Sequence, residues 1–355
     1  MTRLTYSTRD YDKFIGIDVD KKSYVFSIGD HDSMSRSKKI PASPEHLHNY
    51  IQNNFKGKRV ICGYEAGPTG FYLHDYLTDK GIPCLVIPPL SIPKAANEKV
   101  KNNQIDSKKI TTEIINAKIK AVRVPKGRYR ELRYLVKARE NYARDRKVAK
   151  QRIKALLLYA NLYPLINEDN VRWSSCYIKK LKNIQCSFAV RKSLDMLLDD
   201  LEYSRNKTLS ILRELKGFVK NNPAISKNMG YLQSIPGIGF ITSVTLLGRM
   251  GDPQYLKNER EVGAFAGLVP IEKSTGDKVN RGGITHLGNT TLRFLLIESA
   301  WVAIRKDTQL SQYYYRIKRK NHPKIASKVA ITAVARKLTQ RIYRVLKDQR
   351  NYIVY

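Results

Sequence analysis

The spacing of apolar residues changes near residue 125, and this change constrains the fold more than any other feature of the sequence. Before it, apolar residues form short runs with the length and composition of β-strands, as in Phe14–Asp20 (FIGIDVD) and Ser23–Gly29 (SYVFSIG). Beyond it, they recur at helical spacing along two long segments, Arg130–Ala160 and Phe188–Lys220. The sequence therefore predicts an α/β domain followed by a mainly helical chain.

Turn residues and further apolar runs complete this outline. In the α/β part they predict more strands at Ser35–Ala42, Arg59–Tyr64 and Pro83–Ile87, and helices at Pro44–Asn54, Phe71–Lys80 and Ser107–Lys120. In the helical part they predict two helices around a turn within Tyr231–Arg249, and single helices at Glu259–Ala266, Asn289–Arg305 and Lys324–Lys347. Leu162–Cys186 is predicted to be irregular and Ile271–Gly288 to be a loop. We predict three domains: residues 1–125, a basic helical or coiled-coil linker at 126–225, and a helical C-terminal domain at 226–355.

The chain is strongly basic: 65 Lys and Arg against 31 Asp and Glu give a net charge of +34. Basic residues are concentrated in segments such as Lys137–Lys154 and Arg336–Arg344, and many lie beside one of the 22 Tyr residues. Because Lys and Arg neutralise phosphates and Tyr stacks on bases, we expect a nucleic acid partner. A hydrophobic content of 42% excludes wholesale disorder, and no apolar run reaches the roughly 18 residues of a membrane-spanning helix. The four scattered Cys residues are typical of a reduced, cytoplasmic protein.

Three acidic residues mark a candidate metal site in the α/β part. Asp18 lies in the first predicted strand, Glu65 follows the fourth, and Asp106 opens the helix after the fifth. In a ribonuclease H-like fold the central strands and that helix bring such acids together, and the acids hold divalent ions, Mg²⁺ or Mn²⁺, that polarise a phosphodiester. Asp20 could share the strand face of Asp18. A single acid at a strand end is more often a turn or cap residue, but the ordered set favours a metal site.

Two further segments point to phosphate chemistry. Ile235–Gly239 (IPGIG) resembles a helix-hairpin-helix, in which Gly237 and Gly239 let the backbone approach a nucleic-acid phosphate; the alternative is a plain turn between helices. Pro270–Gly283 (PIEKSTGDKVNRGG) places two hydroxyls among cations, which stabilise an alkoxide and the charge on an attacked phosphate. Taken alone, such a loop is usually ordinary surface. The hydroxyls belong to Ser274 and Thr275, and the cations are Lys273, Lys278 and Arg281.

These segments together resemble the DEDD-type insertion-sequence transposases, which act as bridge-RNA-guided DNA recombinases. The resemblance covers nearly the whole chain and is weakest in Tyr129–Gly230. It is carried by IGIDVDKKSYVFSI (Ile15–Ile28), GYEAGPTG (Gly63–Gly70), IPCLVIPP (Ile82–Pro89), KNNQIDSKKI (Lys101–Ile110), LQSIPGIGFITSVTLLGRMGD (Leu232–Asp252) and FAGLVPIEKSTGDKVNRGGITHLGNTTLRFLLIESA (Phe265–Ala300).

The resemblance implies a RuvC-like N-terminal domain whose acids bind Mg²⁺, a coiled-coil linker and a C-terminal transposase domain. It implies a Ser nucleophile that forms a covalent phosphoserine link to DNA, and a structured noncoding guide RNA that pairs with donor and target DNA. It further implies a homo-oligomer, a dimer or a tetramer, in which domains of different subunits complete one site. We expect a prokaryotic cytoplasmic protein that joins the nucleoid when it is bound to DNA and has no membrane partner.

Carried over residue by residue, the family acids are Asp18, Glu65 and Asp106. The family has a further Asp one helical turn before the last of these, where this chain has Asn103, whose carbonyl oxygen can ligate a metal but carries no charge. Counting from Pro270 and keeping the Gly that follows the nucleophile would place that role on Thr275. A secondary alcohol is hindered, so we favour Ser274 and keep Thr275 as its rival.

Two other functions fit the same residues. A RuvC-like metal-dependent nuclease would use the acids without a covalent intermediate, and the C-terminal loop would only bind DNA. A non-enzymatic basic protein would bind nucleic acid and use the acids structurally. Asn103 is the residue that most favours these alternatives, because it removes one charge from the expected ligand set.

Overall fold

The structure of the chain, a computed structural model, describes residues 6–89, 92, 103–117, 119, 121–162, 173–272, 281–285 and 287–354. It divides into two compact units, Met1–Val124 and Pro125–Tyr355. The first contains a five-stranded sheet and the second is mainly helical, which confirms the predicted α/β part and helical remainder. The division into three domains stays a prediction.

The sheet of the first unit has the order β3-β2-β1-β4-β5. β1 pairs with β2, and β2 with β3, in the antiparallel direction, whereas β1 pairs with β4, and β4 with β5, in the parallel direction. The carboxyl ends of these parallel strands therefore lie at one edge. The strands are β1 (Lys13–Val19), β2 (Ser23–Gly29), β3 (Lys38–Pro41), β4 (Val60–Glu65) and β5 (Cys84–Ile87).

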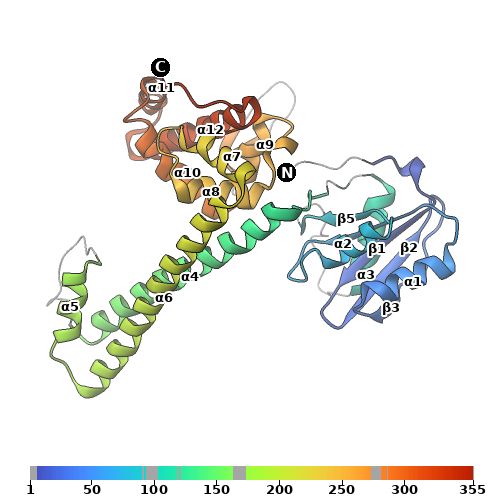
Figure 1. The fold of residues 1–355 in the computed structure, drawn as a ribbon, viewed down its shortest axis with the longest axis horizontal. Helices are drawn as coiled ribbons and strands as arrows, with labels where there is room; N and C mark the ends of the chain where they lie inside the picture. Colours follow the sequence, from blue (N-terminus) through green and yellow to red (C-terminus); the bar gives the residue numbers. More distant parts are fainter. Residues whose placement is uncertain are drawn as a thin grey trace. The chain divides into compact units, whose positions relative to one another are not determined.

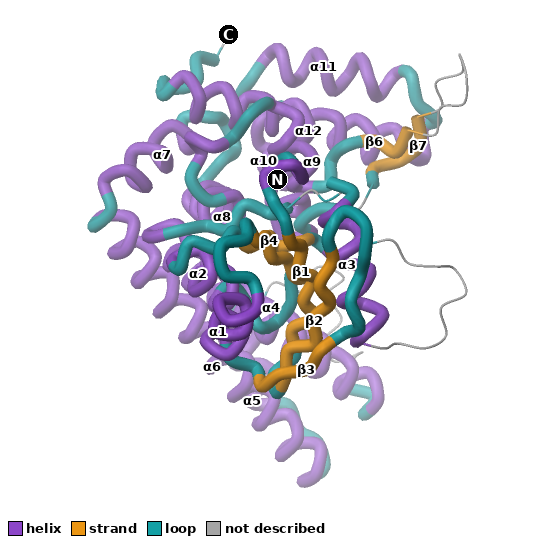
Figure 2. Tube along the Cα trace, turned by 90° about the vertical axis from the view of Figure 1, so that its right-hand side faces the viewer, coloured by secondary structure: helices purple, strands orange, loops and turns teal. Residues whose placement is uncertain are grey.

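Helices cover both faces of this sheet (Figure 2). Ile15 and Ile17 point to one face, where they share a core with α1 (Pro44–Asn54) and α2 (Tyr72–Asp79). Phe14 points to the opposite face, because side chains alternate along a strand, and it packs against α3 (Asn103–Ile115). Burial on both faces explains why β1 reads as a nearly continuous apolar run.

The second unit begins with two long helices, α4 (Gly127–Tyr159) and α6 (Phe188–Lys220), which lie side by side (Figure 1). They are antiparallel, since the start of α4 and the end of α6 share one core, and the end of α4 and the start of α6 share another with α5 (Ser175–Asn183). Between these cores the seam contains small polar residues, Ser204 and Thr208. The apolar face of α6 is only partly buried: Leu194, Leu198, Leu201 and Leu215 are buried, whereas Leu209 is exposed.

A bundle of helices completes the second unit around one apolar core. In the described part of the chain, no helix is long and apolar enough to span a membrane. A short hairpin of β6 (Pro270–Glu272) and β7 (Arg281–Ile284) projects from the bundle. The helices are α7 (Pro223–Gln233), α8 (Phe240–Met250), α9 (Glu259–Ala266), α10 (Thr290–Ala303), α11 (Thr308–Arg319) and α12 (Pro323–Asp348).

Several elements lie where the sequence predicts them, and others do not. The bounds of β2, α1, α6 and α9 are as predicted, and Ser43 accepts a hydrogen bond from the His46 amide at the start of α1. α3 starts earlier than predicted, at Asn103. The irregular segment contains α5, the predicted loop contains β7 and most of β6, and α11 is an additional helix. These elements are short or strongly polar, so their apolar spacing is a weak signal.

Candidate active site

Asp18 and Glu65 occupy neighbouring strands on the same face of the sheet. The parallel register pairs Phe14 with Ile61 and Ile17 with Tyr64, so the next step places Asp18 beside Glu65. Alternation puts both acids on the face that α3 covers. Asp18 is half-buried and Glu65 is exposed, as expected where strands end at the edge of a sheet. The sequence prediction that these two acids come together agrees with this register.

The helix α3 crosses this face so closely that β1 has a glycine beneath it. A Cβ at Gly16 would lie 2.3 Å from the Thr111 amide nitrogen and 2.5 Å from the Ser107 carbonyl oxygen. The Gly16 amide donates to the Thr111 hydroxyl at 3.0 Å, and the Ser27 and Ser107 hydroxyls are 2.9 Å apart. These buried contacts fix the height and register of the helix over the strands.

The direction of α3 places its first turn toward the two strand acids. Gly29, which pairs with Phe14, lies beside Ile115 near the end of the helix. Ser27, which pairs with Gly16, contacts Ser107 nearer the start. Moving along β1 toward Asp18 therefore means moving toward the helix N-terminus. The half-buried residues Asn103 and Asp106 lie in that first turn.

The donors at this edge are carboxylate and amide oxygens, which is the ligand chemistry of Mg²⁺ or Mn²⁺. Within the described residues, neither Glu65 nor Asp106 forms an ion pair, so both carboxylates are available. No three Asp, Glu, His or Cys side chains in the described ranges are close enough to hold a metal together as they stand. Like charges repel, so drawing these acids into one cluster requires a cation between them.

The turn after Glu65 is held by the preceding residue. Tyr64 is fully buried, and its hydroxyl donates to the Gly70 carbonyl oxygen at 2.9 Å. Burial raises the pKa of Tyr64, so the phenol remains protonated and can donate. Gly70 adopts a positive φ of 74°, which favours glycine in this turn. The GYEAGPTG segment thus fixes the backbone on which Glu65 sits.

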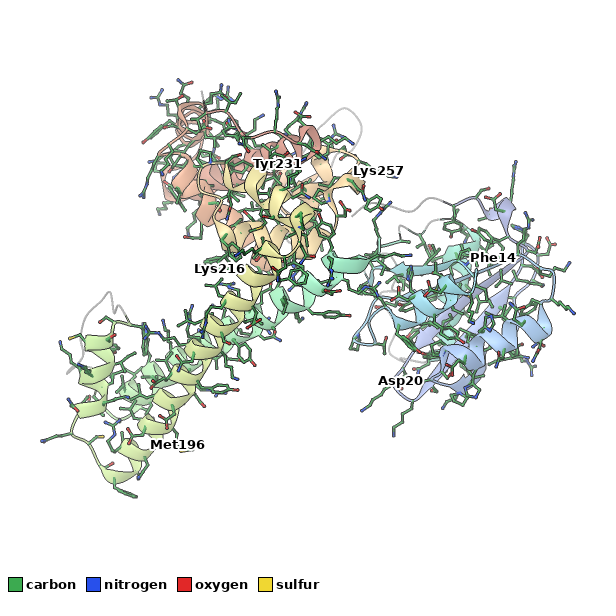
Figure 3. All side chains as sticks on the ribbon, viewed as in Figure 1. Phe14, Asp20, Met196, Lys216, Tyr231 and Lys257 are labelled. Atoms are coloured by element: carbon green, nitrogen blue, oxygen red, sulfur yellow. The ribbon has the colours of Figure 1, made fainter. Side chains whose placement is uncertain are left out.

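Asp20 does not continue the strand face of Asp18. β1 ends at Val19, and Asp20 is exposed in the hairpin turn (Figure 3). Its carboxylate accepts a hydrogen bond from the Lys21 amide at 2.6 Å. Asp20 is therefore a turn residue, which is the common role of an acid at the end of a strand.

The two glycines of the IPGIG turn have different surroundings. Gly237 has a φ of 86°, and a Cβ there would lie 2.2 Å from the Ser299 carbonyl oxygen of α10. This glycine is therefore required by helix packing. Gly239 is exposed, has open space where a Cβ would point, and begins α8 without a side-chain cap. Only Gly239 leaves the helix N-terminus accessible to an anion.

The predicted nucleophile loop lies largely outside the described residues. Ser274, Thr275, Lys273 and Lys278 all fall within 273–280. Arg281 begins β7 and is described for its backbone alone. The flanking strands pair Glu272 with Arg281, so the loop connects the two strands of a hairpin.

Sequence reasoning missed a basic cleft on α12. Lys337, Arg341 and Arg344 recur at helical spacing and line a cleft with residues of the C-terminal tail. Their spacing was visible in the sequence as part of Arg336–Arg344, but nothing local indicates that the tail folds back over them. The cleft is therefore a tertiary feature.

Comparisons with known proteins cover both units. Residues 15–161 match the DEDD transposase domain of the IS110 family, and residues 229–315 match the transposase IS116/IS110/IS902 family. The protein y4qE of Sinorhizobium fredii, whose name describes a transposase, is 25% identical over 96% of this chain and 90% of its own length. The transposase for insertion sequence element IS1111A of Coxiella burnetii is 38% identical over 26% of this chain and 24% of its own. The pilin gene-inverting protein of Moraxella bovis is 23% identical over 62% of this chain and 58% of its own.

Proposed function

We propose that the chain is an RNA-guided enzyme that exchanges strands between donor and target DNA, on the premise that residues 15–161 and 229–315 match transposase models of the IS110 and IS116/IS110/IS902 families. The observation that carries the proposal is the placement of Asp18, Glu65 and the first turn of α3 at one edge of the sheet. The matched family supports an enzyme of DNA transposition. We further propose that a guide RNA selects the DNA, and that a hydroxyl nucleophile forms a covalent protein–DNA intermediate.

In this proposal Asp18, Glu65 and Asp106 hold Mg²⁺ or Mn²⁺, with the Asn103 carbonyl oxygen as a neutral ligand. When bound, the metal polarises the scissile phosphodiester. The chain itself positions the ligands, since the buried contact between Ser27 and Ser107 holds α3 in register with the strands. A RuvC-like N-terminal domain is consistent with this arrangement.

The covalent step uses a hydroxyl of the C-terminal unit. The Ser274 Oγ forms a bond to the phosphorus of a DNA phosphodiester, and the bond from that phosphorus to one DNA oxygen breaks. The departing DNA oxygen takes up the proton that the Ser274 hydroxyl loses. One phosphoester replaces another, so the strand can be rejoined without ATP. Thr275 is the rival nucleophile. The side chains expected to stabilise the negative charge that develops on the attacked phosphate are those of Lys273, Lys278 and Arg281.

Contacts between the protein and the DNA phosphates would hold the DNA at the proposed site. We assign one phosphate contact to the N-terminus of α8 at Gly239, with Gly237 shaping the turn. The assembly proposed is a homo-oligomer, dimer or tetramer, with donor DNA, target DNA and a structured noncoding RNA. The gene-inverting name of the Moraxella bovis relative supports recombination over simple hydrolysis, because inversion requires that broken strands be rejoined.

The test incubates the protein and the noncoding RNA that flanks its gene with donor and target DNA, in Mg²⁺ or in EDTA. Recombined junctions and protein-linked DNA that need both Mg²⁺ and the RNA are expected. Hydrolysed ends without protein-linked DNA would instead identify the RuvC-like nuclease. No Mg²⁺-dependent activity would identify the non-enzymatic nucleic-acid-binding protein.

Two variants separate the proposed roles. Ser274→Ala should abolish the protein–DNA adduct, and Asp18→Ala should abolish both the adduct and cleavage. Asp32→Ala is a matched control, since Asp32 is exposed in the segment after β2 and should retain both. Adducts that persist in Ser274→Ala and disappear in Thr275→Ala would transfer the role to Thr275.

A further inference from the structure

A cleft of about 300 Å³ lies between the last turns of α12 and the C-terminal tail. The helix contributes Lys337, Arg341 and Arg344, and the tail contributes Arg350, Tyr352 and Ile353. This volume is at the lower end for small-molecule sites, so the cleft is wide enough for a nucleotide-sized group.

The tail wall of this cleft is firmly held. The Tyr352 amide donates to the Ser234 hydroxyl at 2.8 Å, next to the IPGIG turn, and the Tyr352 hydroxyl donates to Asp307 at 2.7 Å. Asp307 is buried and also pairs with Arg341, whose guanidinium lies 4.9 Å from the centre of the Tyr352 ring. The cleft is therefore built from contacts between distant segments, and its wall is not a loose chain end.

The charges of the cleft leave two cations available. Arg341 is neutralised by Asp307, and Arg350 pairs with Asp348 at 3.3 Å. The single carboxylate in the lining, that of Glu259, accepts a hydrogen bond from Gln340 at 2.9 Å. Lys337 and Arg344 are exposed, lie two helical turns apart on one face, and form no ion pair among the described residues.

We propose that this cleft binds one nucleotide of a single-stranded nucleic acid, with its phosphate on Lys337 and Arg344 and its sugar and base against Tyr352 and Ile353. Ile353 lines the cleft and is 58% exposed, so its apolar side chain is open to contact with a bound base. Cations beside an aromatic wall are the combination that binds single strands. The inference rests on the proposed function and adds a nucleic-acid site whose residues lie outside the predicted nucleophile segment of the sequence.

The test measures binding of fluorescently labelled oligo(dT) and oligo(U) to the full chain by fluorescence anisotropy, at several salt concentrations. The double variant Lys337→Gln/Arg344→Gln should weaken binding by about tenfold, because it removes charge-assisted contacts. The salt slope should become less steep by about 0.7 for each lost phosphate contact. A loss for oligo(dT) alone indicates a DNA strand, a loss for oligo(U) alone indicates RNA, and either supports the site.

The matched control is Lys324→Gln/Lys328→Gln, which removes the same charge from exposed positions of α12 outside the cleft. It should leave binding nearly unchanged. Equal losses in the two double variants would overturn the inference, because they would reflect net charge alone. An equal loss for a duplex probe would overturn the single-strand assignment.

A second variant tests the apolar wall. Ile353→Ser should weaken binding of oligo(dT) and leave binding of an abasic oligomer unchanged; equal effects on the two probes would contradict the assigned base contact. Failure of these binding tests is distinguishable from failure of the proposed function. If the binding tests fail but the wild-type chain still forms protein–DNA adducts, the cleft is rejected as a binding site and the proposed chemistry stands.

Discussion

At the residue scale, Asn103 is the residue in which the candidate metal site departs from the ligand set that the family resemblance implies. It lies in the first turn of α3 with Asp106, at the helix end nearest Asp18. An amide oxygen ligates more weakly than a carboxylate, because it brings no charge to the cation. If Asn103 is a ligand, we expect this position to lower the affinity of the site for the metal.

Asn103→Asp should lower the Mg²⁺ concentration needed for half-maximal DNA cleavage, because it adds a negative charge to the ligand set. A titration of Mg²⁺ in the cleavage assay measures the effect. Asn53→Asp, a change of the same charge at an exposed position of α1, should leave the titration unchanged. An identical midpoint for Asn103→Asp and the wild type would remove this residue from the ligand set.

A second prediction at the residue scale concerns stability. Glu140 on α4 is 8% exposed and pairs with Arg249 on α8, whose Nε lies 3.3 Å from a carboxylate oxygen. Burial, and then the charge of Arg249, lowers the pKa of nearby Arg133, whereas the charge of Glu140 raises it. Glu140 therefore offsets the repulsion between these two arginines. Glu140→Gln should cost about 3–5 kcal/mol of the free energy of unfolding, since it leaves a buried cation unpaired.

Urea unfolding measures this cost, and the same helix offers a matched control. Glu131 pairs with Arg128 at 2.8 Å on the surface of α4, with both side chains at least half exposed. Glu131→Gln should cost less than about 1 kcal/mol. Similar costs for the two variants would show that the Glu140 pair is not a buried interaction in solution.

At the scale of elements, the close approach of α3 to β1 decides whether the acids can meet. Gly16→Ala would place a methyl group against the backbone of α3, so the helix must move outward and take Asp106 with it. We expect a loss of about 1–3 kcal/mol in the free energy of unfolding, together with weaker Mg²⁺-dependent cleavage.

Urea unfolding and the Mg²⁺ titration together test this prediction. Gly217→Ala is the control: Gly217 lies within α6 and a Cβ there meets nothing within 4 Å. It should stabilise the chain by up to about 1 kcal/mol through helix propensity. Unchanged stability and metal dependence in Gly16→Ala would mean that the helix does not need this close approach.

At the scale of the whole molecule, each unit has its own apolar cores. The two cores of the sheet draw all their residues from Met1–Val124, including Val124 at its end. The cores of the helical part draw theirs from Pro125–Tyr355. The separate cores agree with the division of the chain between Val124 and Pro125.

We therefore expect a fragment of residues 1–124 to fold alone and to unfold cooperatively on heating, as followed by circular dichroism. A shorter fragment that ends at Ile87 is the control. It lacks α3 and exposes the face of Phe14 and Ile61, so it should bind a hydrophobic dye and melt without a sharp transition. A dye-binding, non-cooperative 1–124 fragment would show that the sheet unit depends on the rest of the chain.

The sequence alone predicts most of this architecture, because the signals for it are local. The strand runs and the apolar faces of α4 and α6 each depend on a few neighbouring residues. The same reasoning predicts Asp18, Glu65 and Asp106 as the acids of the candidate site, and their roles stay predictions. The hidden helices α5 and α11 were missed because they bury few apolar side chains.

Tertiary structure decided the features that depend on distant segments. Only the register of β1 with β4 shows that Asp18 and Glu65 are neighbours, and only the packing of α10 shows why Gly237 must be a glycine. The cleft on α12 exists because Tyr352 bonds to Ser234 and Asp307. Residues this far apart in sequence leave no shared periodicity, so their contacts appear once the chain is folded.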